Sequence, residues 1–184
     1  MINEEGGGRE EKKVEKTFKI AVTYSGFLGR LIRWLGRIRH LDYQWNHILF
    51  VRFEDGIPAW TYESNIRGIV NHTFDEKRDL AEEHLWYIAT DPMSAPEIEH
   101  LQGFCEGATG KWYALHQWLA IGWRILKDIL LGPTYWQAME AIPARTCISF
   151  VDAAGRSVRR PVSPFGSGGL PDDIERSPYW EEEI

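Results

Sequence analysis

Apolar and polar side chains alternate along the first half of the chain, beginning at Phe18. Phe18, Ile20 and Val22 are separated by Lys19 and Ala21, and this period of two predicts a β-strand over residues 18–22. Further strand-like runs, bounded by turn-forming residues, occupy residues 46–52, 57–63, 68–74 and 84–90. The stretch 75–83 is polar and is interpreted as a turn. These runs predict an antiparallel sheet.

Helical spacing of apolar residues appears at 28–38 and becomes dominant after Pro92. The pattern predicts helices over residues 95–108 and 113–131, and Gly132-Pro133 ends the second of them. Residues 156–169 form a Pro-, Gly- and Ser-rich loop, after which Pro171 begins a last short helix. The order of strands and helices predicts an α+β fold in which helices pack on the antiparallel sheet.

The runs 46–52 and 57–63 are joined by Glu54-Asp55-Gly56 and predict a β-hairpin. A three-residue loop would pair residue 53 with residue 57, and would therefore set His47 beside Glu63 on one face of the sheet. A two-residue Asp-Gly turn would set Glu63 opposite Ile48, on the other face. We expect the three-residue loop.

The segment Ile142 to Gly155 places Cys147 at the start of a helix. Pro143 ends what precedes it, Thr146 is an N-cap residue type, and apolar residues recur at helical spacing from Ile148 until Gly155 ends the run. Free backbone N–H groups and the helix dipole favour a thiolate in a first turn, which would make Cys147 a nucleophile. A buried cysteine that packs as a small hydrophobic residue is the alternative.

Composition limits the classes of protein to which the chain can belong. It has 184 residues with nine Trp, seven Tyr and eight Phe, enough for one aromatic-rich core in residues 17–184. Residues 1–16 are charged and Gly-rich and are expected to be a disordered tail. A net charge of −6 argues against a nucleic-acid partner. No apolar run is long enough to be an integral membrane span.

Two cysteines cannot form a disulfide framework, and the first residues lack the features of a signal peptide. We therefore expect a cytoplasmic location, while a phage-encoded protein or another delivery route stays open. His100 and Cys105 are five residues apart on one predicted helix, which is not the spacing of metal ligands. No metal and no cofactor is expected, and Cys105 is interpreted as structural.

Among the six histidines, only His47 has a partner that the strand register suggests. A carboxylate at Glu63 would hold the imidazole in one tautomer and stabilise its cation, as the third group does in cysteine and serine hydrolases. A half-buried histidine without a catalytic role is the alternative. His72, on the next predicted strand, is the second candidate.

Five motifs occur in an order that resembles a known family. They are WNHILFV with His47, WTYESNIRGI with Glu63, GKWYALHQWL, RTCISFVDAAG with Cys147, and GGLPDDIERSP. The chain looks like the permuted papain-like cysteine hydrolases related to the NlpC/P60 family, of the YiiX/YebB-like kind. The resemblance covers residues 18–180 and implies a circularly permuted papain-like fold. It also implies Cys147 as nucleophile, His47 as base and Glu63 as the third member.

The resemblance implies a thiol-dependent amide or ester hydrolase, a cysteine peptidase or amidase, that works through an acyl-enzyme. Its substrate would be a small peptide, a cell-wall fragment or an acyl lipid, and the oligomeric state stays open. Ile148 and Ser149 replace the Ser and Glu usual in the family, and Ile174 replaces Leu. These departures support an alternative function, a catalytically silent papain-like domain that binds a peptide, lipid or protein partner.

Overall fold

The computed structural model describes residues 14–24, 45, 47–65, 68–80, 83–111, 147–164 and 171–184. The predicted helices at 28–38 and 113–131, and residues 1–13 of the tail predicted over 1–16, lie outside these ranges, whereas the last residue of that tail, Lys16, belongs to the first strand. The described strands are β1 (Lys16–Tyr24), β2 (His47–Glu54), β3 (Ile57–Asn65), β4 (Gly68–Thr73), β5 (Glu83–Ala89) and β6 (Trp180–Glu182). The predicted strands therefore exist, with small shifts at their ends, and β6 is one that the sequence did not reveal.

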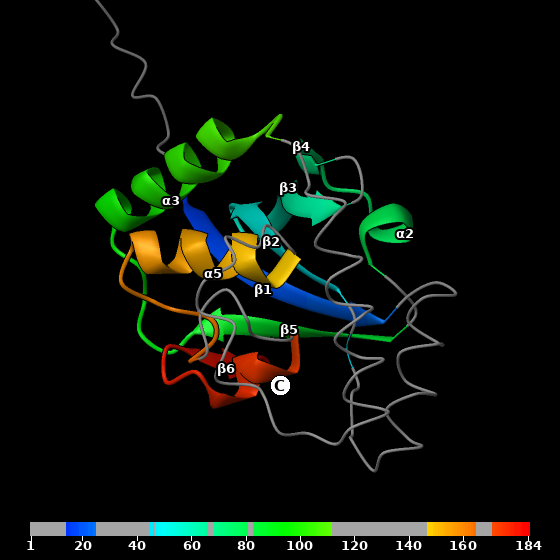
Figure 1. Cartoon of the computed structure of the whole chain (residues 1–184). Coiled ribbons are helices and arrows are strands. Elements are labelled where there is room, and N and C mark those ends of the chain that lie inside the picture. Colours follow the sequence, from blue (N-terminus) through cyan, green and yellow to red (C-terminus); the bar gives the residue numbers. More distant parts are fainter. Residues whose placement is uncertain are drawn as a thin grey trace, which may run out of the picture.

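The six strands form one sheet in the order β4-β3-β2-β1-β5-β6. Every pair of neighbours is antiparallel, which confirms the predicted type of sheet. Strand β1 lies in the middle, as its fully buried Ile20 and Val22 require. Figure 1 shows the sheet curving behind two helices, α3 and α5, that lie across its front.

Helix α3 (Ala95–Ala108) has the bounds that its apolar spacing predicts. Its start is fixed by the carboxylate of Glu97, which accepts hydrogen bonds from the backbone N–H and the hydroxyl of Ser94 at 2.8 and 2.7 Å. Helix α5 (Cys147–Ser157) packs against α3 and against β2 and β3. The expected short helix at Pro171 is the 3-10 helix η3 (Pro171–Arg176).

The two faces of the sheet carry separate apolar clusters. On the face of α3 and α5, sheet residues such as Phe50 and Tyr62 pack with Leu101 of α3 and Val151 of α5. On the other face a smaller cluster joins Leu49 and Val51 to side chains around α2 (Glu76–Asp79), a one-turn helix within the stretch expected to be a turn. Because neighbouring residues of a strand point to opposite faces, these clusters show which way each strand residue points.

The turn of the β2–β3 hairpin differs from the expected one. Glu54 pairs with Ile57 and Phe53 with Pro58, so the loop has two residues, Asp55 and Gly56. Their φ angles of 50° and 79° are both positive, as in a type I′ turn, which Asp-Gly favours because its twist matches that of the strands. The expectation of a three-residue loop was wrong.

A register shift two residues later restores the predicted face of Glu63. Between Phe53 and Arg52 the pairing moves by one residue, so that Arg52 lies opposite Trp60 and Ala59 has no partner on β2. Pro58 has no N–H to donate to the sheet, and prolines within sheets occur at such bulges. The bulge at Ala59 therefore reverses the change of face that the shorter turn would cause.

Helix α5 does not end at Gly155 but continues to Ser157. The chain then turns back, and the Arg160 N–H donates to the Gly155 carbonyl at 2.8 Å. Beyond the turn, the buried carboxylate of Asp152 accepts the backbone N–H groups of Val162 and Ser163, both at 2.9 Å. These bonds hold the returning segment against the helix that carries Cys147.

Gly155 is glycine because the returning chain leaves no room for a side chain. A Cβ atom at this position would come closer than 3.0 Å to the carbonyl oxygen of Arg160. We expect Gly155→Ala to lower the free energy of unfolding by about 1–3 kcal/mol, since the backbone must shift. Urea denaturation monitored by tryptophan fluorescence would measure this loss.

Gly103→Ala in α3 is the matched control, because Gly103 is exposed and a Cβ there has nothing within 4 Å. This variant should raise the free energy of unfolding by about 0.5–1 kcal/mol through its helix propensity. Equal stabilities for the two variants would contradict the packing described for Gly155.

Candidate active site

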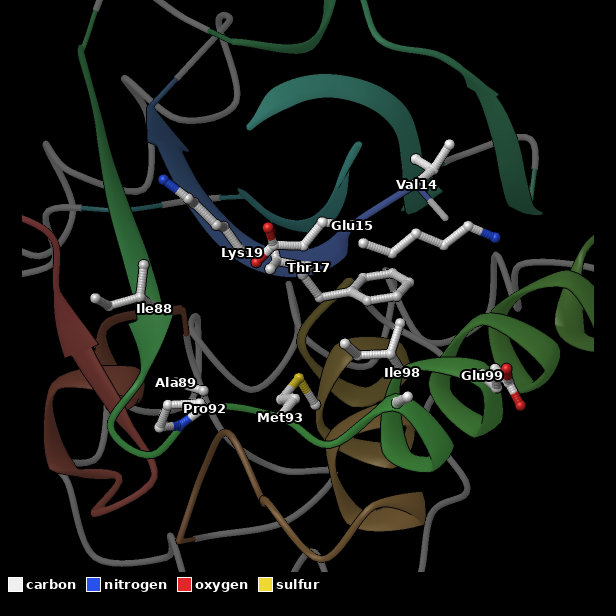
Figure 2. A pocket seen from close by; sticks show the side chains of 13 residues that line it. Val14, Glu15, Thr17, Lys19, Ile88, Ala89, Pro92, Met93, Ile98 and Glu99 are labelled. Carbon is white, nitrogen blue, oxygen red and sulfur yellow. The ribbon is translucent and has the colours of Figure 1, made fainter. Parts of the chain in front are cut away.

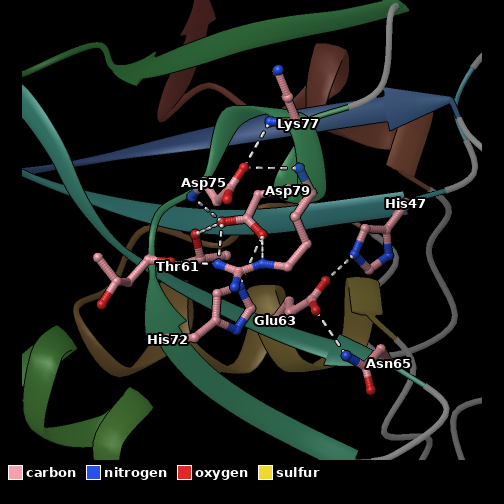
Figure 3. A network of polar contacts seen from close by, with 10 residues as sticks. His47, Thr61, Glu63, Asn65, His72, Asp75, Lys77 and Asp79 are labelled. Carbon is pink, nitrogen blue, oxygen red and sulfur yellow. Dashed lines mark hydrogen bonds and ion pairs between the residues drawn. The ribbon is translucent and has the colours of Figure 1, made fainter.

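Three of the residues predicted for the site meet at one end of the sheet, where β2 begins and β3 ends. His47 is the first residue of β2, and Glu63 lies two residues before the end of β3. The His47 Nε2 atom is 2.7 Å from Oε2 of Glu63 (Figure 3). Continuing the Phe50–Tyr62 register puts Glu63 opposite Leu49, so His47 and Glu63 are diagonal neighbours on one face.

Cys147 is the first residue of α5, and its side chain is only partly buried. It lies close enough to the His47 ring to raise the pKa of that ring, both as a hydrogen-bond partner and as a charge. Nε2 faces Glu63, so Nδ1 is the ring nitrogen that does not face the carboxylate. The body of α5 packs on the Phe50 face of the sheet, so this contact is made at the end of β2 rather than over its middle. The proposed N-cap Thr146 and helix breaker Pro143 lie outside the described residues.

The surroundings of His47 favour its cationic form. Burial by itself would lower its pKa, because an imidazolium loses water. Hydrogen bonds with Cys147 and Glu63, and the negative charges that these groups can carry, oppose burial and raise the pKa of His47 from 6.5 to about 10. The side chain keeps 21% of its surface exposed, so the ring is held by its partners and still reached by solvent.

Glu63 is held from two sides. Its Oε2 faces His47, and its Oε1 accepts a hydrogen bond from Asn65 Nδ2 at 2.7 Å (Figure 3). Burial would raise the pKa of Glu63, but the hydrogen bond and charge of His47, followed by the bond from Asn65, lower it below 4.5. Asn65 was not among the predicted residues. The signal was its position two residues after Glu63, on the same face of a strand.

The second candidate, His72, has a different partner. On β4 it pairs with Thr61, and its Nε2 is 2.9 Å from Oδ1 of Asp79 in α2. Asp79 also accepts bonds from the Thr61 hydroxyl at 2.6 Å and from Arg78 Nε at 2.7 Å. Burial would raise the pKa of Asp79, but its donors, Arg78 first, lower that pKa to about 2. The structure thus brings His72 to a carboxylate of its own and not to Cys147.

Cys105 lies fully buried in α3, and burial raises the pKa of its thiol far above the usual range. It packs in the apolar cluster, as expected for a structural cysteine. Across the described parts of the chain, no group of three or more His, Cys, Asp or Glu side chains is arranged to hold a metal ion. No helix in those parts is long and apolar enough to span a membrane.

A groove of about 730 Å³ lies at the opposite end of β1 from this site. It is lined by residues 14–19, by the end of β5 with Ile88 and Ala89, and by Met93 and Ile98 near the start of α3 (Figure 2). His47 lies beside Thr23, at the other end of the strand. The groove therefore contains none of the predicted site residues.

Comparison with known proteins identifies the fold. No family model matches the chain, and no curated protein matches it. Among solved structures, it is similar to the crystal structure of YiiX from Escherichia coli O157:H7, which is described as a metalloprotein. The match covers 91% of this chain and 96% of YiiX, with 13% sequence identity and a TM-score of 0.53. The chain therefore has the permuted papain-like, NlpC/P60-related fold of YiiX, as its motifs suggested.

The two cysteines should differ strongly in reactivity. Cys147 is partly exposed and hydrogen-bonded to a histidine, whereas Cys105 is buried and its pKa is raised. After brief treatment with iodoacetamide at pH 6.5, we expect peptide mass mapping to find label on Cys147 and almost none on Cys105. Labelling of Cys105 first would contradict this geometry, and Cys147→Ser is the control that should abolish early labelling.

Proposed function

We propose that this protein is a thiol-dependent hydrolase in which Cys147 attacks an amide or ester carbonyl. The observation that carries the proposal is the continuous contact from thiol to imidazole to carboxylate at the start of α5. Such a chain of nucleophile, base and orienting group characterises cysteine and serine hydrolases that form acyl-enzymes. The papain-like fold is consistent with that chemistry, although the fold alone does not assign it.

In the proposed reaction, His47 already holds the proton of the thiol, as its raised pKa favours, and the Cys147 sulfur adds to the substrate carbonyl. Collapse of the tetrahedral intermediate breaks the bond to the leaving group, which takes the proton from His47. The neutral imidazole then removes a proton from water, whose oxygen attacks the thioester and releases the acid and the free thiol. Glu63 keeps the ring in one tautomer and stabilises its cation throughout.

The start of α5 would supply electrostatic help for the intermediate. The first N–H groups of a helix have no partner within the helix, and the helix dipole is positive there. The backbone N–H of Cys147 is therefore a natural donor to the oxyanion. One such donor is typically worth about 3–4 kcal/mol of barrier lowering.

The described residues do not offer a site that would make this chain a metalloprotein like YiiX. The imidazole of His47 interacts with Glu63 on one side and with Cys147 on the other. Among the described residues, no three His, Cys, Asp or Glu side chains are arranged so that they could bind one metal ion. The proposed mechanism accordingly has no step through a metal.

The alternative, a silent domain that binds through the same cleft, was suggested by Ile148 and Ser149. Both side chains are buried, with 4% and 5% of their surfaces exposed. Their departure from the usual Ser and Glu is therefore a change within the packed interior, not on a surface that meets the substrate. This weakens the main support for a silent domain.

A panel of peptide-amide, cell-wall peptide, ester and thioester substrates tests the proposal. Cys147→Ala and His47→Ala should abolish turnover while keeping the melting temperature close to that of the wild type. Glu63→Gln should fold and lose roughly 10- to 100-fold in kcat/KM, because it replaces a charged hydrogen-bond partner with a neutral one. If Cys147→Ala matched the wild type on every substrate that the wild type cleaves, the silent domain would be the better description.

The raised pKa of His47 predicts a specific pH dependence. A ring with a pKa of about 10 keeps its proton through neutral pH and loses it as the pH rises towards 10, and without that proton it cannot protonate the leaving group. We expect kcat/KM to fall on this alkaline side. In Glu63→Gln the loss of the carboxylate lowers the pKa of His47, so the fall should begin at lower pH. An unchanged alkaline side in that variant would argue against the role given to Glu63.

A further inference from the structure

We propose that Asn65 is a positioning residue for the reaction, and that its amide fixes the Glu63 carboxylate in the orientation in which it contacts His47. The proposal rests on the proposed function. Asn65 Nδ2 donates to Oε1 of Glu63 at 2.7 Å, while Oε2 is 2.7 Å from His47 Nε2. Figure 3 shows the carboxylate between the two side chains, with one oxygen directed to each.

A glutamate at this position needs such a constraint. Its side chain has several rotatable bonds, and 17% of its surface remains exposed at the end of the sheet. Ordering a long side chain costs conformational entropy, which a single contact with His47 must overcome alone. A second hydrogen bond on the other oxygen removes the rotation that would exchange the two oxygens and tilt the carboxylate away from the ring.

Asn65 itself starts from a fixed backbone position. It is the last residue of β3 and pairs with Gly68, the first residue of β4. The φ angle of Gly68 is 115°, a value that residues with a side chain rarely adopt, so the position that pairs with Asn65 favours glycine. The amide is thus carried by a residue that is paired within the sheet.

The neutral charge of Asn65 also matters for the site. Within the described parts of the chain, the charged groups that act on Glu63 are His47 from β2, His72 from β4 and Arg78 from α2, and Cys147 of α5 acts on it through His47. A lysine or arginine at position 65 would compete with His47 for the carboxylate. An amide orients the carboxylate without adding a charge, and so leaves the imidazolium as its ionic partner.

The first test does not depend on catalysis. In a Cys147→Ala background, NMR would follow the titration of the His47 ring with and without Asn65→Ala. We expect Asn65→Ala to lower the midpoint by about 0.5 pH, because a loosened and more easily protonated carboxylate stabilises the imidazolium less. An unchanged midpoint would overturn the proposal.

Asn71→Ala is the matched control. Asn71 lies on the neighbouring strand opposite Tyr62, and therefore on the other face of the sheet from Glu63. Asn71→Ala removes the same type of side chain away from the Glu63 carboxylate, and should leave the titration midpoint of His47 unchanged. A shift of equal size in both variants would mean that the effect is general loosening of the sheet, and would overturn the proposal.

The second test uses the wild-type background and any substrate that the panel identifies. Asn65→Ala should lower kcat about tenfold and leave KM within about twofold, since the contact acts on the base and not on the substrate. The isosteric Asn65→Asp places a second carboxylate beside Glu63 and raises the pKa of the pair, so the acidic side of the kcat profile should move to higher pH. A wild-type profile in Asn65→Asp would overturn the proposal.

The two tests separate the two proposals. The NMR midpoint decides whether Asn65 holds the carboxylate, whether or not the substrate panel finds turnover. Absence of Cys147-dependent turnover together with a shifted midpoint would refute the hydrolase and retain the geometry assigned to Asn65.

Discussion

The contact between His47 and Glu63 depends on which face of the sheet each residue occupies, and that face is decided by the register in which β2 pairs with β3. Two local features set this register. The type I′ turn at Asp55-Gly56 is one residue shorter than the loop that would bring the side chains together, and the bulge at Ala59 adds one residue back. Each feature alone would send the carboxylate to the opposite face, where the apolar side chains of Phe50 and Tyr62 pack.

The polar face of β3 carries two histidine–carboxylate pairs with different surroundings. In one, His72 meets an aspartate that is almost fully buried and saturated by donors from α2 and β3. In the other pair, Glu63 contacts the His47 ring with one carboxylate oxygen and accepts a hydrogen bond from the Asn65 amide with the other. The second nitrogen of the ring is not used by this carboxylate. The first pair joins α2 to the sheet. In the second pair, one ring nitrogen of His47 is not bound to the carboxylate. A residue that takes part in a reaction needs such an available atom.

Sequence patterns predicted the strands and helix α3 because each rests on a strong local signal, whereas the grouping of Cys147, His47 and Glu63 was expected from the order of the motifs and from the family that they resemble. Alternation identifies a strand, and a Pro-Glu start followed by apolar spacing identifies α3. The bulge could not be predicted, because it is a compromise between the Asp-Gly turn and a proline that cannot donate to the neighbouring strand. The sequence did not predict helix α2 or strand β6, because both are short and tertiary contacts decide their structure. The contact between Asn65 and Glu63 was not predicted either, because it too depends on tertiary structure. The correct face for Glu63 thus followed from a turn that was assigned wrongly.

The compensating turn and bulge have a consequence for how relatives of this chain should be compared. An alignment that introduces no gap in the hairpin will match Glu63 with an acid on the same face only if the other protein has either a bulge like this one or a loop one residue longer. In a relative with a two-residue turn and a regular ladder, the equivalent carboxylate would be found one position out of step, and a search for an invariant column would miss it. Conservation of the site should therefore be judged by the face of the sheet on which a carboxylate lies. We expect a change in the length of the turn to be accompanied by the gain or loss of a bulge, so that this face is kept.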